Sequence, residues 1–239
     1  MKLIVKNKPT PLHHKLVEFK KGINGTFPNL TRDIKDDLLK ALLEEQGYIC
    51  AYCMQKINET NAQIEHIIGQ RYIDENGNNL GNQNQLNYDN LIAVCQGKSC
   101  VEGEHCDSNR SKFQKDCPQR KLFVTPLENR LMQNIRFTPK GMIFYKDFIE
   151  IEKIDNLKEY KKLDEDSNIR YDLQKVLNLN CENLKVKRIN LINALKKYTK
   201  NWSNQEKIRK ELTKYSSKSN NKYEELCQVA IYILNKKLK

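Results

Sequence analysis

The chain has 239 residues, which is enough for one large domain or two small ones. Apolar residues make up 38% of it and charged residues 30%, a composition that argues against a disordered chain and against an integral membrane protein. No stretch approaches the roughly 18 apolar residues of a membrane span, and the start MKLIVKNKPT has no apolar run of signal-peptide length. We therefore expect a cytoplasmic protein that contacts no membrane.

The formal net charge of +12 is concentrated near the C-terminal end of the chain. Residues 181–239 carry 15 basic and 5 acidic side chains, whereas residues 1–180 carry 27 basic and 25 acidic ones. A basic excess of this kind favours a polyanionic partner such as nucleic acid, because Lys and Arg that neutralise phosphates release condensed counterions. A solvated, Lys-rich helix surface accounts for the same composition equally well.

The N-terminal part of the chain predicts an irregular arm followed by one helix. Prolines and glycines interrupt residues 1–30 throughout, which favours irregular structure. Thr31 is then a suitable N-cap, apolar residues recur at helical spacing over residues 34–42, and Gly47 supplies a stop. Residues 1–46 are therefore expected to form an arm and an amphipathic helix.

The next part of the chain predicts two strands and a helix. Residues 62–68 and 91–94 are short apolar runs that are typical of strands. Residues 74–88, which lie between them, are rich in Asn and Gly and predict a solvent loop. A short helix is expected over residues 107–116. Together these elements define an expected unit over residues 47–121.

The C-terminal half predicts a hairpin followed by helices. Residues 122–148 mix aromatic residues with prolines and with a Pro-Lys-Gly turn, which suggests a small hairpin within an expected unit over residues 122–168. Residues 155–167 are expected to be a linker. The basic unit over residues 169–239 predicts an amphipathic helix over 184–198, a capping box from Ser203 to Glu206, and a last helix lined by apolar residues from Leu226 to Leu234.

Cysteines indicate a metal site in the unit over residues 47–121. The cytosol keeps thiols reduced, so eight cysteines favour metal binding over disulfides. Cys50 and Cys53 form a C-x-x-C pair in a turn-like segment, and two such thiolates can reach one Zn²⁺. A tetrahedral site needs two more ligands, and spacing does not choose among the candidates, while buried core thiols are the alternative. The candidates are Cys95, Cys100, His105 and Cys106.

Glu65 and His66 are the strongest candidates for catalytic residues. They stand together near the end of a predicted strand. A carboxylate oxygen can hold a hard cation, and a neutral imidazole can take a proton from water. A lone Glu-His pair is nevertheless more often made of surface residues or a satisfied core histidine. Its interpretation therefore depends on the residues around it.

The order of these residues resembles the HNH endonuclease motif. A C-x-x-C pair is followed by Glu65-His66, by Asp89-Asn90-Leu91-Ile92 and then by His105-Cys106-Asp107. More closely, the chain is similar to the HNH nucleases of Septu-type and retron-associated anti-phage systems. That similarity spans most of residues 1–195 and is carried by residues 42–53, 64–66, 88–91 and 105–107, and by Leu177-Asn178-Leu179-Asn180 with Leu184 and Arg188.

The resemblance implies a fold and a role for each matching residue. In that family two strands and the helix that follows them form a ββα-metal core. His66 then matches the general base that deprotonates the attacking water, and Glu65 matches the acidic metal ligand. Asn90 matches the residue that braces the loop carrying the histidine. The expected zinc ligands are Cys50, Cys53, Cys95 and Cys106, with Cys100 as an alternative.

Two residues compete for the third corner of the catalytic metal site. Asp107 follows the cysteine directly and has Arg110 three residues on, as the family pattern requires. Asn109 has the more usual side chain and has Lys112 three residues on. We slightly favour Asp107. Arg110 and Lys112 are candidates for contacts with the phosphates of a nucleic acid, and solvated surface charge is the alternative for each.

These observations together predict an α+β protein that is mostly helical, with a ββα-metal HNH core, a zinc knuckle and a helical C-terminal region. The expected activity is hydrolysis of DNA with Mg²⁺ or Mn²⁺ as catalytic cation and Zn²⁺ as structural ion. The resemblance implies an anti-phage effector that works with an ATPase partner of the AAA or SMC type, in some systems with a reverse transcriptase and its small DNA. RNA is the alternative substrate. A non-catalytic zinc module that binds a nucleic acid or a protein partner is the alternative from another class.

Overall fold

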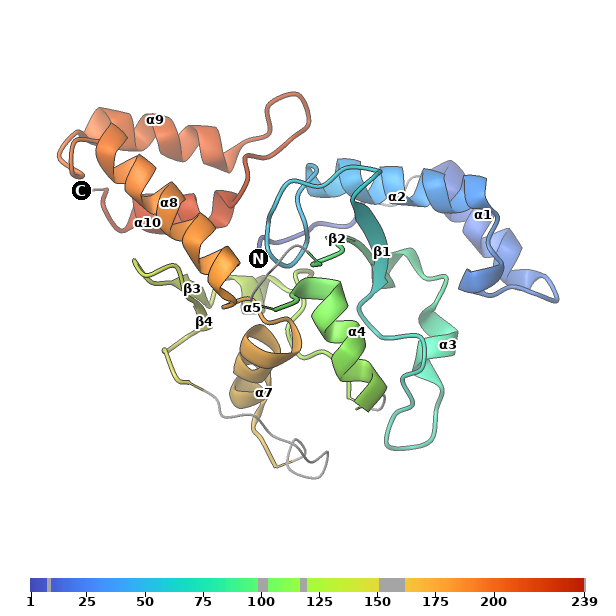
Figure 1. Cartoon of the computed structure of the whole chain (residues 1–239). Helices are drawn as coiled ribbons and strands as arrows, with labels where there is room; N and C mark the ends of the chain where they lie inside the picture. Colours follow the sequence, from blue (N-terminus) through green and yellow to red (C-terminus); the bar gives the residue numbers. More distant parts are fainter. Residues whose placement is uncertain (8–9, 99–102, 117–119, 151–161, 239) are drawn as a thin grey trace.

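The computed structural model describes residues 1–7, 10–98, 103–116, 120–150 and 162–238 (Figure 1). Its described part is an α+β structure whose strands form two antiparallel two-stranded sheets. The strands are β1 (Ala62–His66), β2 (Leu91–Cys95), β3 (Ile135–Phe137) and β4 (Ile143–Tyr145). The α-helices are α1 (Thr10–Lys21), α2 (Arg32–Gln46), α3 (Leu80–Asn84), α4 (Cys106–Asp116), α5 (Asn129–Met132), α7 (Glu165–Tyr171), α8 (Glu182–Tyr198), α9 (Gln205–Ser216) and α10 (Cys227–Asn235).

The N-terminal segment contains a helix that the sequence did not predict. α2 agrees with expectation, because the Thr31 side chain accepts from the backbone N–H of Ile34 and Gly47, at φ +64°, ends the helix. The expectation of an irregular arm over residues 1–30 is wrong, since α1 occupies part of it. Its buried side chains Leu12 and Leu16 are one helical turn apart and join the core.

The β1–β2 hairpin lies at the centre of the molecule and carries the predicted strands (Figure 1). Glu65 pairs with Ile92 and His66 with Leu91 across the hairpin. The connection between the strands is not wholly a loop, because it contains α3, whose first turn is capped by the Asn79 side chain accepting from the N–H of Asn82. A 3-10 turn, Tyr88–Asn90, leads directly into β2.

The second half of the chain forms the predicted hairpin and a helical region. β3 and β4 pair around a turn that contains Gly141 at φ +73°. α7 begins at Glu165, so its first residues fall within the expected linker over residues 155–167, of which residues 155–161 are outside the described part. A π-helical segment, Asp172–Val176, follows α7. α9 takes Asn204 as its N-cap, one residue beyond the Ser203 that the capping box suggested, because the Asn204 side chain accepts from Lys207 N–H.

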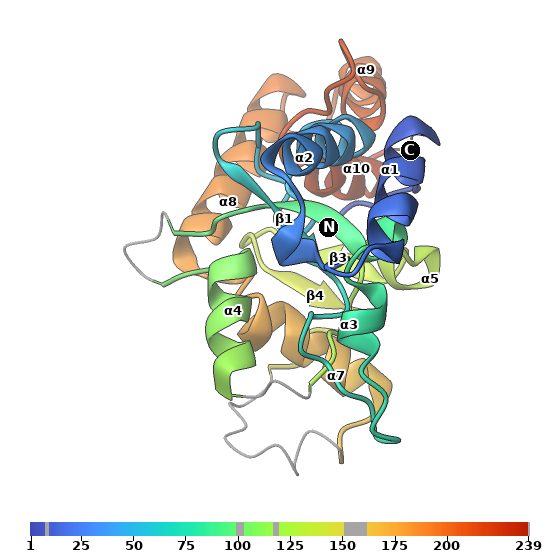
Figure 2. The same ribbon diagram turned by 90° about the vertical axis from the view of Figure 1, so that its right-hand side faces the viewer.

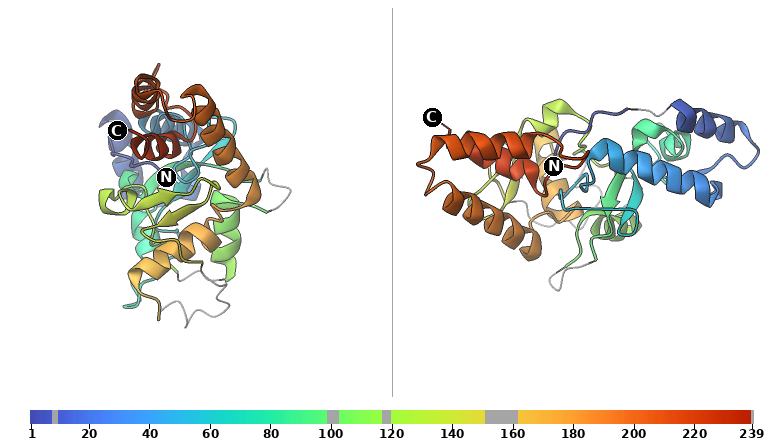
Figure 3. Two further views of the ribbon diagram at one scale, coloured as in Figure 1. Left: turned by 90° about the vertical axis from the view of Figure 1, so that its left-hand side faces the viewer. Right: turned by 90° about the horizontal axis from the view of Figure 1, so that it is seen from above.

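One apolar core connects these parts. The N-terminus lies in the middle of the molecule, between the β1–β2 hairpin and the C-terminal helices (Figures 2 and 3), and Met1 is fully buried. Backbone N–H groups of the C-terminal region bond to carbonyls of the cysteine-containing turn, Tyr223 to Gly47 at 3.0 Å and Leu226 to Met54 at 3.0 Å. Within the described ranges, no helix combines the length and apolar character that crossing a membrane requires.

Candidate functional site

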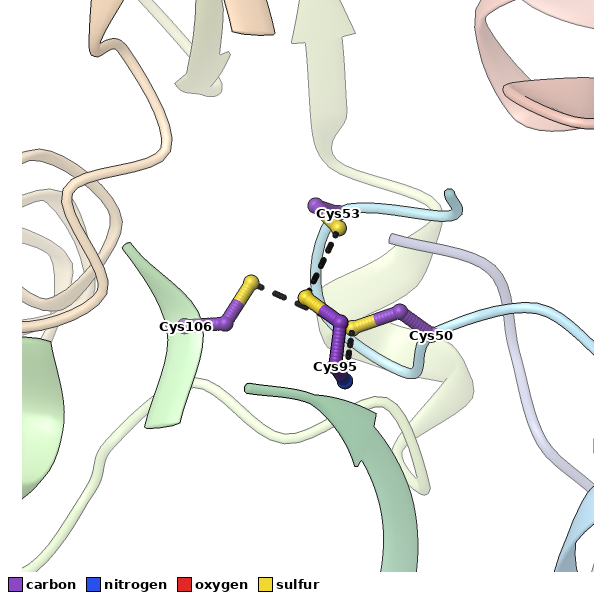
Figure 4. A group of neighbouring side chains, drawn as sticks. All are labelled: Cys50, Cys53, Cys95 and Cys106. Atoms are coloured by element: carbon purple, nitrogen blue, oxygen red, sulfur yellow. Dashed lines mark hydrogen bonds between the residues drawn. The ribbon is translucent and has the colours of Figure 1, made fainter. Parts of the chain in front are cut away.

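Four cysteines form a compact cluster in the described part of the chain (Figure 4). Their sulfur atoms all lie within 4.8 Å of one another, with 3.9 Å between Cys50 and Cys106 and 3.6 Å between Cys53 and Cys95. Thiolates bound tetrahedrally at about 2.3 Å from Zn²⁺ are about 3.8 Å apart. The four residues therefore fit a metal such as zinc, and they are the expected ligand set. Cys100 lies outside the described residues.

Local structure explains why these cysteines meet. Cys50 and Cys53 lie in a turn that is closed by backbone bonds, from Cys50 N–H to the Gln55 carbonyl at 2.8 Å and from Met54 N–H to the Cys50 carbonyl at 2.9 Å. Cys95 ends β2, and its N–H donates to the Cys50 sulfur at 3.3 Å. Cys106 begins α4. Burial raises the pKa of the Cys106 thiol, so a bound cation would have to supply the charge that stabilises its thiolate.

His105 lies beside the cluster. Its imidazole is fully buried, with Nδ1 3.2 Å from the Cys106 sulfur and 4.0 Å from the Cys95 sulfur. Burial also lowers the pKa of His105, which favours the neutral ring. The spacing left His105 as a possible fourth ligand. The four sulfur atoms already supply the four ligands that a zinc site needs, so His105 is a close neighbour of the cluster.

Glu65 is held by a buried arginine. Its side chain accepts a hydrogen bond from the Arg110 guanidinium, which reaches it from α4 and also donates to the Tyr52 hydroxyl at 3.0 Å and to the Ile67 carbonyl at 2.7 Å. Burial raises the pKa of Glu65, whereas the charge of Arg110 lowers it and so favours the carboxylate. Arg110 is only 1% exposed, which does not agree with the expectation that it contacts phosphates on the surface.

Asp107 lies next to Glu65, whereas Asn109 does not join it. Asp107, in the first turn of α4, accepts from the Gln63 amide, and its charge helps to raise the pKa of Glu65. The Asn109 amide instead donates to the carbonyls of Lys175 at 2.7 Å and Val176 at 2.8 Å, at the end of the π-helical segment. Of the two candidates for the third corner, the structure therefore brings Asp107 to Glu65.

Lys112 is the remaining residue that the sequence assigned to nucleic-acid binding. Its side chain lies on α4 and is 67% exposed, so it is accessible to a polyanion. It forms an exposed ion pair with Glu104 at 3.1 Å. Exposed ion pairs contribute little to stability and exchange partners readily, so this pairing leaves the accessibility of the Lys112 ammonium group unchanged.

The imidazole of His66 is held in place by a backbone carbonyl and an aromatic ring. Its Nε2 lies 2.9 Å from the Gln85 carbonyl, and its ring packs edge-on against Phe27 with 4.5 Å between centroids. Because a carbonyl only accepts, Nε2 carries the proton and Nδ1 keeps a lone pair. Burial lowers the pKa of His66 to about 4, so the ring is neutral at pH 7.

Asn90 ties the segment after His66 to the end of α3. Its Oδ1 accepts from Ile68 N–H at 2.7 Å, and its Nδ2 donates to the carbonyls of Ile68 at 3.1 Å and Asn84 at 3.2 Å. All of these partners are backbone groups, so the side chain fixes the path of the chain. This is the positioning role that the resemblance implies for Asn90.

Several neighbours of these residues were not identified from the sequence. Gln63 precedes Glu65 by two residues, so the alternation of a strand would have placed both side chains on the same face. Tyr52 lies between the two cysteines of the C-x-x-C pair, and this position alone gave less indication than strand alternation that its side chain would reach the site. Nothing in the sequence pointed to Gln85 or Phe27, because both contact His66 through a chain reversal that depends on the tertiary structure.

Comparison with known proteins does not assign the chain to a family. No family model matches it, and a search of curated proteins finds no match. The motif resemblance and the geometry of the site therefore carry the functional argument.

Proposed function

We propose that this protein is a metal-dependent endonuclease of the HNH type that hydrolyses phosphodiester bonds in DNA. The observation that carries the proposal is the gathering of Glu65 and Asp107 by two strands and a helix that a four-cysteine cluster fastens together. The bracing of the following loop by Asn90, and the fixed tautomer of His66, add to it.

The residues suggest a division of roles. Nδ1 of His66 is the atom that would accept a proton from the attacking water, since Nε2 is engaged by the Gln85 carbonyl and the ring is neutral at pH 7. Glu65 and Asp107 would hold Mg²⁺ or Mn²⁺, which proteins commonly bind through one or two carboxylates. A cation there would polarise the scissile phosphate and neutralise charge on the leaving oxygen.

The four-cysteine cluster would serve catalysis indirectly. Cys106 is the residue before Asp107, at the start of α4. A metal bound by the cluster would therefore fix the first turn of α4 against β2 and the C-x-x-C turn, and with it the position of the Asp107 carboxylate. The zinc is thus structural in this proposal, and the site that holds it is closed to substrate.

Arg110 sets a condition on this activity. Its guanidinium forms an ion pair with the Glu65 carboxylate. A catalytic cation would need the same carboxylate as a ligand, so the two positive groups would compete for it. Binding of the cation therefore requires Arg110 to give up Glu65 while it keeps the Tyr52 hydroxyl and the Ile67 carbonyl. The same contact favours a second candidate function, a non-catalytic zinc module, since in that role Glu65 would need only its partner Arg110.

The substrate is proposed from the charge of the chain, and the partner from the resemblance. The basic C-terminal region suits either nucleic acid, and the motif reads no sugar, so RNA stays the alternative to DNA. An ATPase of the AAA or SMC type, in some systems with a reverse transcriptase and its small DNA, is proposed as partner in anti-phage defence on the resemblance alone.

Cleavage assays with matched histidine variants test the proposal. Purified full-length protein, with its partner ATPase added in parallel, is incubated with DNA and with RNA in Mg²⁺ or Mn²⁺. Loss of a general base should slow cleavage by His66→Ala about 10²–10⁴-fold. His14→Ala, which removes an exposed histidine of α1, should cleave like the unmodified protein. Equal cleavage by both variants would remove His66 from the mechanism.

A second assay separates catalysis from binding. A Glu65→Ala, His66→Ala double variant should lose cleavage and biological activity together if the protein is a nuclease. If that variant retains metal and full biological activity, the binding-module function is correct.

A further inference from the structure

Arg188 is a buried cation whose guanidinium is only partly satisfied. It lies in the middle of α8 and is 0% exposed. Its Nη1 donates to the Gly141 carbonyl at 2.9 Å, in the β3–β4 turn. Among the described residues, its Nε and Nη2 have no hydrogen-bond partner. An unpaired buried charge is strongly unfavourable, so this arrangement needs a compensating group.

Two other buried arginines have such a group. Arg110 faces the carboxylate of Glu65, and Arg120 faces that of Asp172. Arg188 makes no ion pair within the described ranges. Arg188 lies close enough to Cys53, Cys181 and Cys106 for thiolate forms of these residues to favour its charge, and Cys53 and Cys106 belong to the four-cysteine cluster.

The four-cysteine cluster, in contrast, lacks positive charge when it holds a metal. A divalent cation balances only half the charge of four thiolates, so a metal-loaded cluster remains negative. Its sulfurs are largely buried, and water cannot supply the missing positive charge there.

We propose that Arg188 is the counter-charge of the metal centre formed by Cys50, Cys53, Cys95 and Cys106, so that metal binding and the packing of α8 stabilise each other. The inference needs a thiolate-bound divalent metal such as Zn²⁺ and does not depend on nuclease activity. It gives the C-terminal region a role in holding the centre, because the charge of Arg188 connects α8 and the β3–β4 turn to the cluster.

A nearby backbone contact supports the coupling. The N–H of Cys106, a cluster residue, donates to the Leu177 carbonyl at 2.9 Å, in the segment that leads into α8. The metal ligand and the arginine are thus attached to one continuous stretch of structure. Release of the metal would leave the Arg188 charge without compensation and would loosen α8.

Metal affinity of four full-length proteins tests the proposal. The variants are Arg188→Lys, which keeps the charge, Arg188→Gln and Arg188→Met, which remove it, and Lys196→Met, which removes an exposed charge from the same helix. Zn²⁺ affinity is measured by competition with a chromogenic chelator, and Co²⁺ loading is followed through its thiolate charge-transfer band. We expect Arg188→Gln and Arg188→Met to bind metal about 10–100-fold more weakly, the range for losing a residue next to a ligand shell. Arg188→Lys should recover most of the affinity, and Lys196→Met should retain all of it.

The opposite pattern would overturn the proposal. Gln retains a donor for the Gly141 carbonyl, so recovery by Arg188→Gln but not by Arg188→Lys would show that Arg188 acts only through that hydrogen bond. Equal affinity in all the variants, or an unmodified protein that binds no Zn²⁺, would also refute it.

Thermal unfolding gives a second readout that does not require tight metal binding. If Arg188 is the counter-charge, Arg188→Met should have a lower melting temperature than the unmodified protein when both are loaded with zinc. It should not have a lower one after chelator treatment, because the metal-free protein then loses only a buried cation that nothing compensates. An equal decrease in both states would show a purely structural role. If Arg188→Met fails to fold with zinc, Arg188→Gln replaces it in the same comparison.

Discussion

The guanidinium of Arg110 on α4 donates to the carboxylate of Glu65 on β1, and both groups are shielded from solvent. The bond joins residues 45 positions apart and fixes the helix of the proposed nuclease core to its first strand. It also means that Glu65 has its positive partner before any cation binds. The free energy of the Arg110–Glu65 ion pair therefore opposes the binding of a metal at Glu65.

Replacing Arg110 should destabilise the fold strongly. Arg110→Met leaves the buried Glu65 without its partner, and breaking a buried pair in this way costs about 3–5 kcal/mol. The free energy of unfolding from urea titrations measures the loss. Lys112→Met, two residues further along α4 and exposed, should change it by less than about 0.5 kcal/mol. Adding Glu65→Gln to Arg110→Met should restore part of the stability, and a loss below about 1 kcal/mol in the single variant would contradict the prediction.

Asp107 and Asn109 should respond differently to substitution. Asp107→Asn removes a carboxylate from beside Glu65 and should raise the Mg²⁺ or Mn²⁺ concentration needed for cleavage, with little change in unfolding free energy. Asn109→Ala removes two hydrogen bonds to the π-helical segment and should cost about 1–3 kcal/mol of stability. Metal titrations and urea unfolding of both variants distinguish the roles. A metal defect confined to Asn109→Ala would reverse the assignment.

The stability of the protein should fall in mild acid because of His66. Its pKa in the folded protein is lowered from 6.5 to about 4 by burial, so the unfolded chain takes up a proton that the folded protein refuses. The stability that depends on a neutral His66 is fully present above pH 6.5 and is lost as the pH falls toward 4. In this range the free energy of unfolding should fall by up to about 1.4 kcal/mol per pH unit.

His66→Gln tests this origin, since glutamine does not titrate. Its unfolding free energy should vary less steeply between pH 6.5 and 5 than that of the unmodified protein. Zinc content is measured at each pH, so that loss of the metal is not mistaken for the histidine effect. An identical pH dependence in the two proteins would assign the acid sensitivity to other groups.

Removal of the metal should destabilise the whole hairpin unit. The cluster joins the C-x-x-C turn, the end of β2 and the start of α4, so chelation or Cys53→Ser should lower the melting temperature and abolish stoichiometric Zn²⁺ binding. Cys227→Ala changes a buried cysteine outside the cluster and should retain the metal. Because the ligands must be thiolates, acid should also release the metal. Full Zn²⁺ retention by Cys53→Ser would contradict this ligand set.

Much of the local structure followed from the sequence because its causes are local. Thr31 and Gly47 mark the ends of α2 through a side-chain cap and a left-handed stop, and neither depends on distant residues. The two strands of the central hairpin were expected from short apolar runs. The helix α1 was missed because its core contacts are supplied by Leu12 and Leu16 packing on other elements, against proline and glycine signals that favoured irregular structure.

The sequence by itself identified the C-x-x-C pair and a small pool of further candidate ligands, whereas the tertiary structure brought Cys95 and Cys106 to that pair. The tertiary structure alone decided where the polar side chains of the site point. The Arg110 side chain contacts Glu65 and the Asn109 side chain contacts the π-helical segment, although both residues lie on the same helix. The physical reason is that their partners lie far along the chain, and only packing brings them within hydrogen-bond reach.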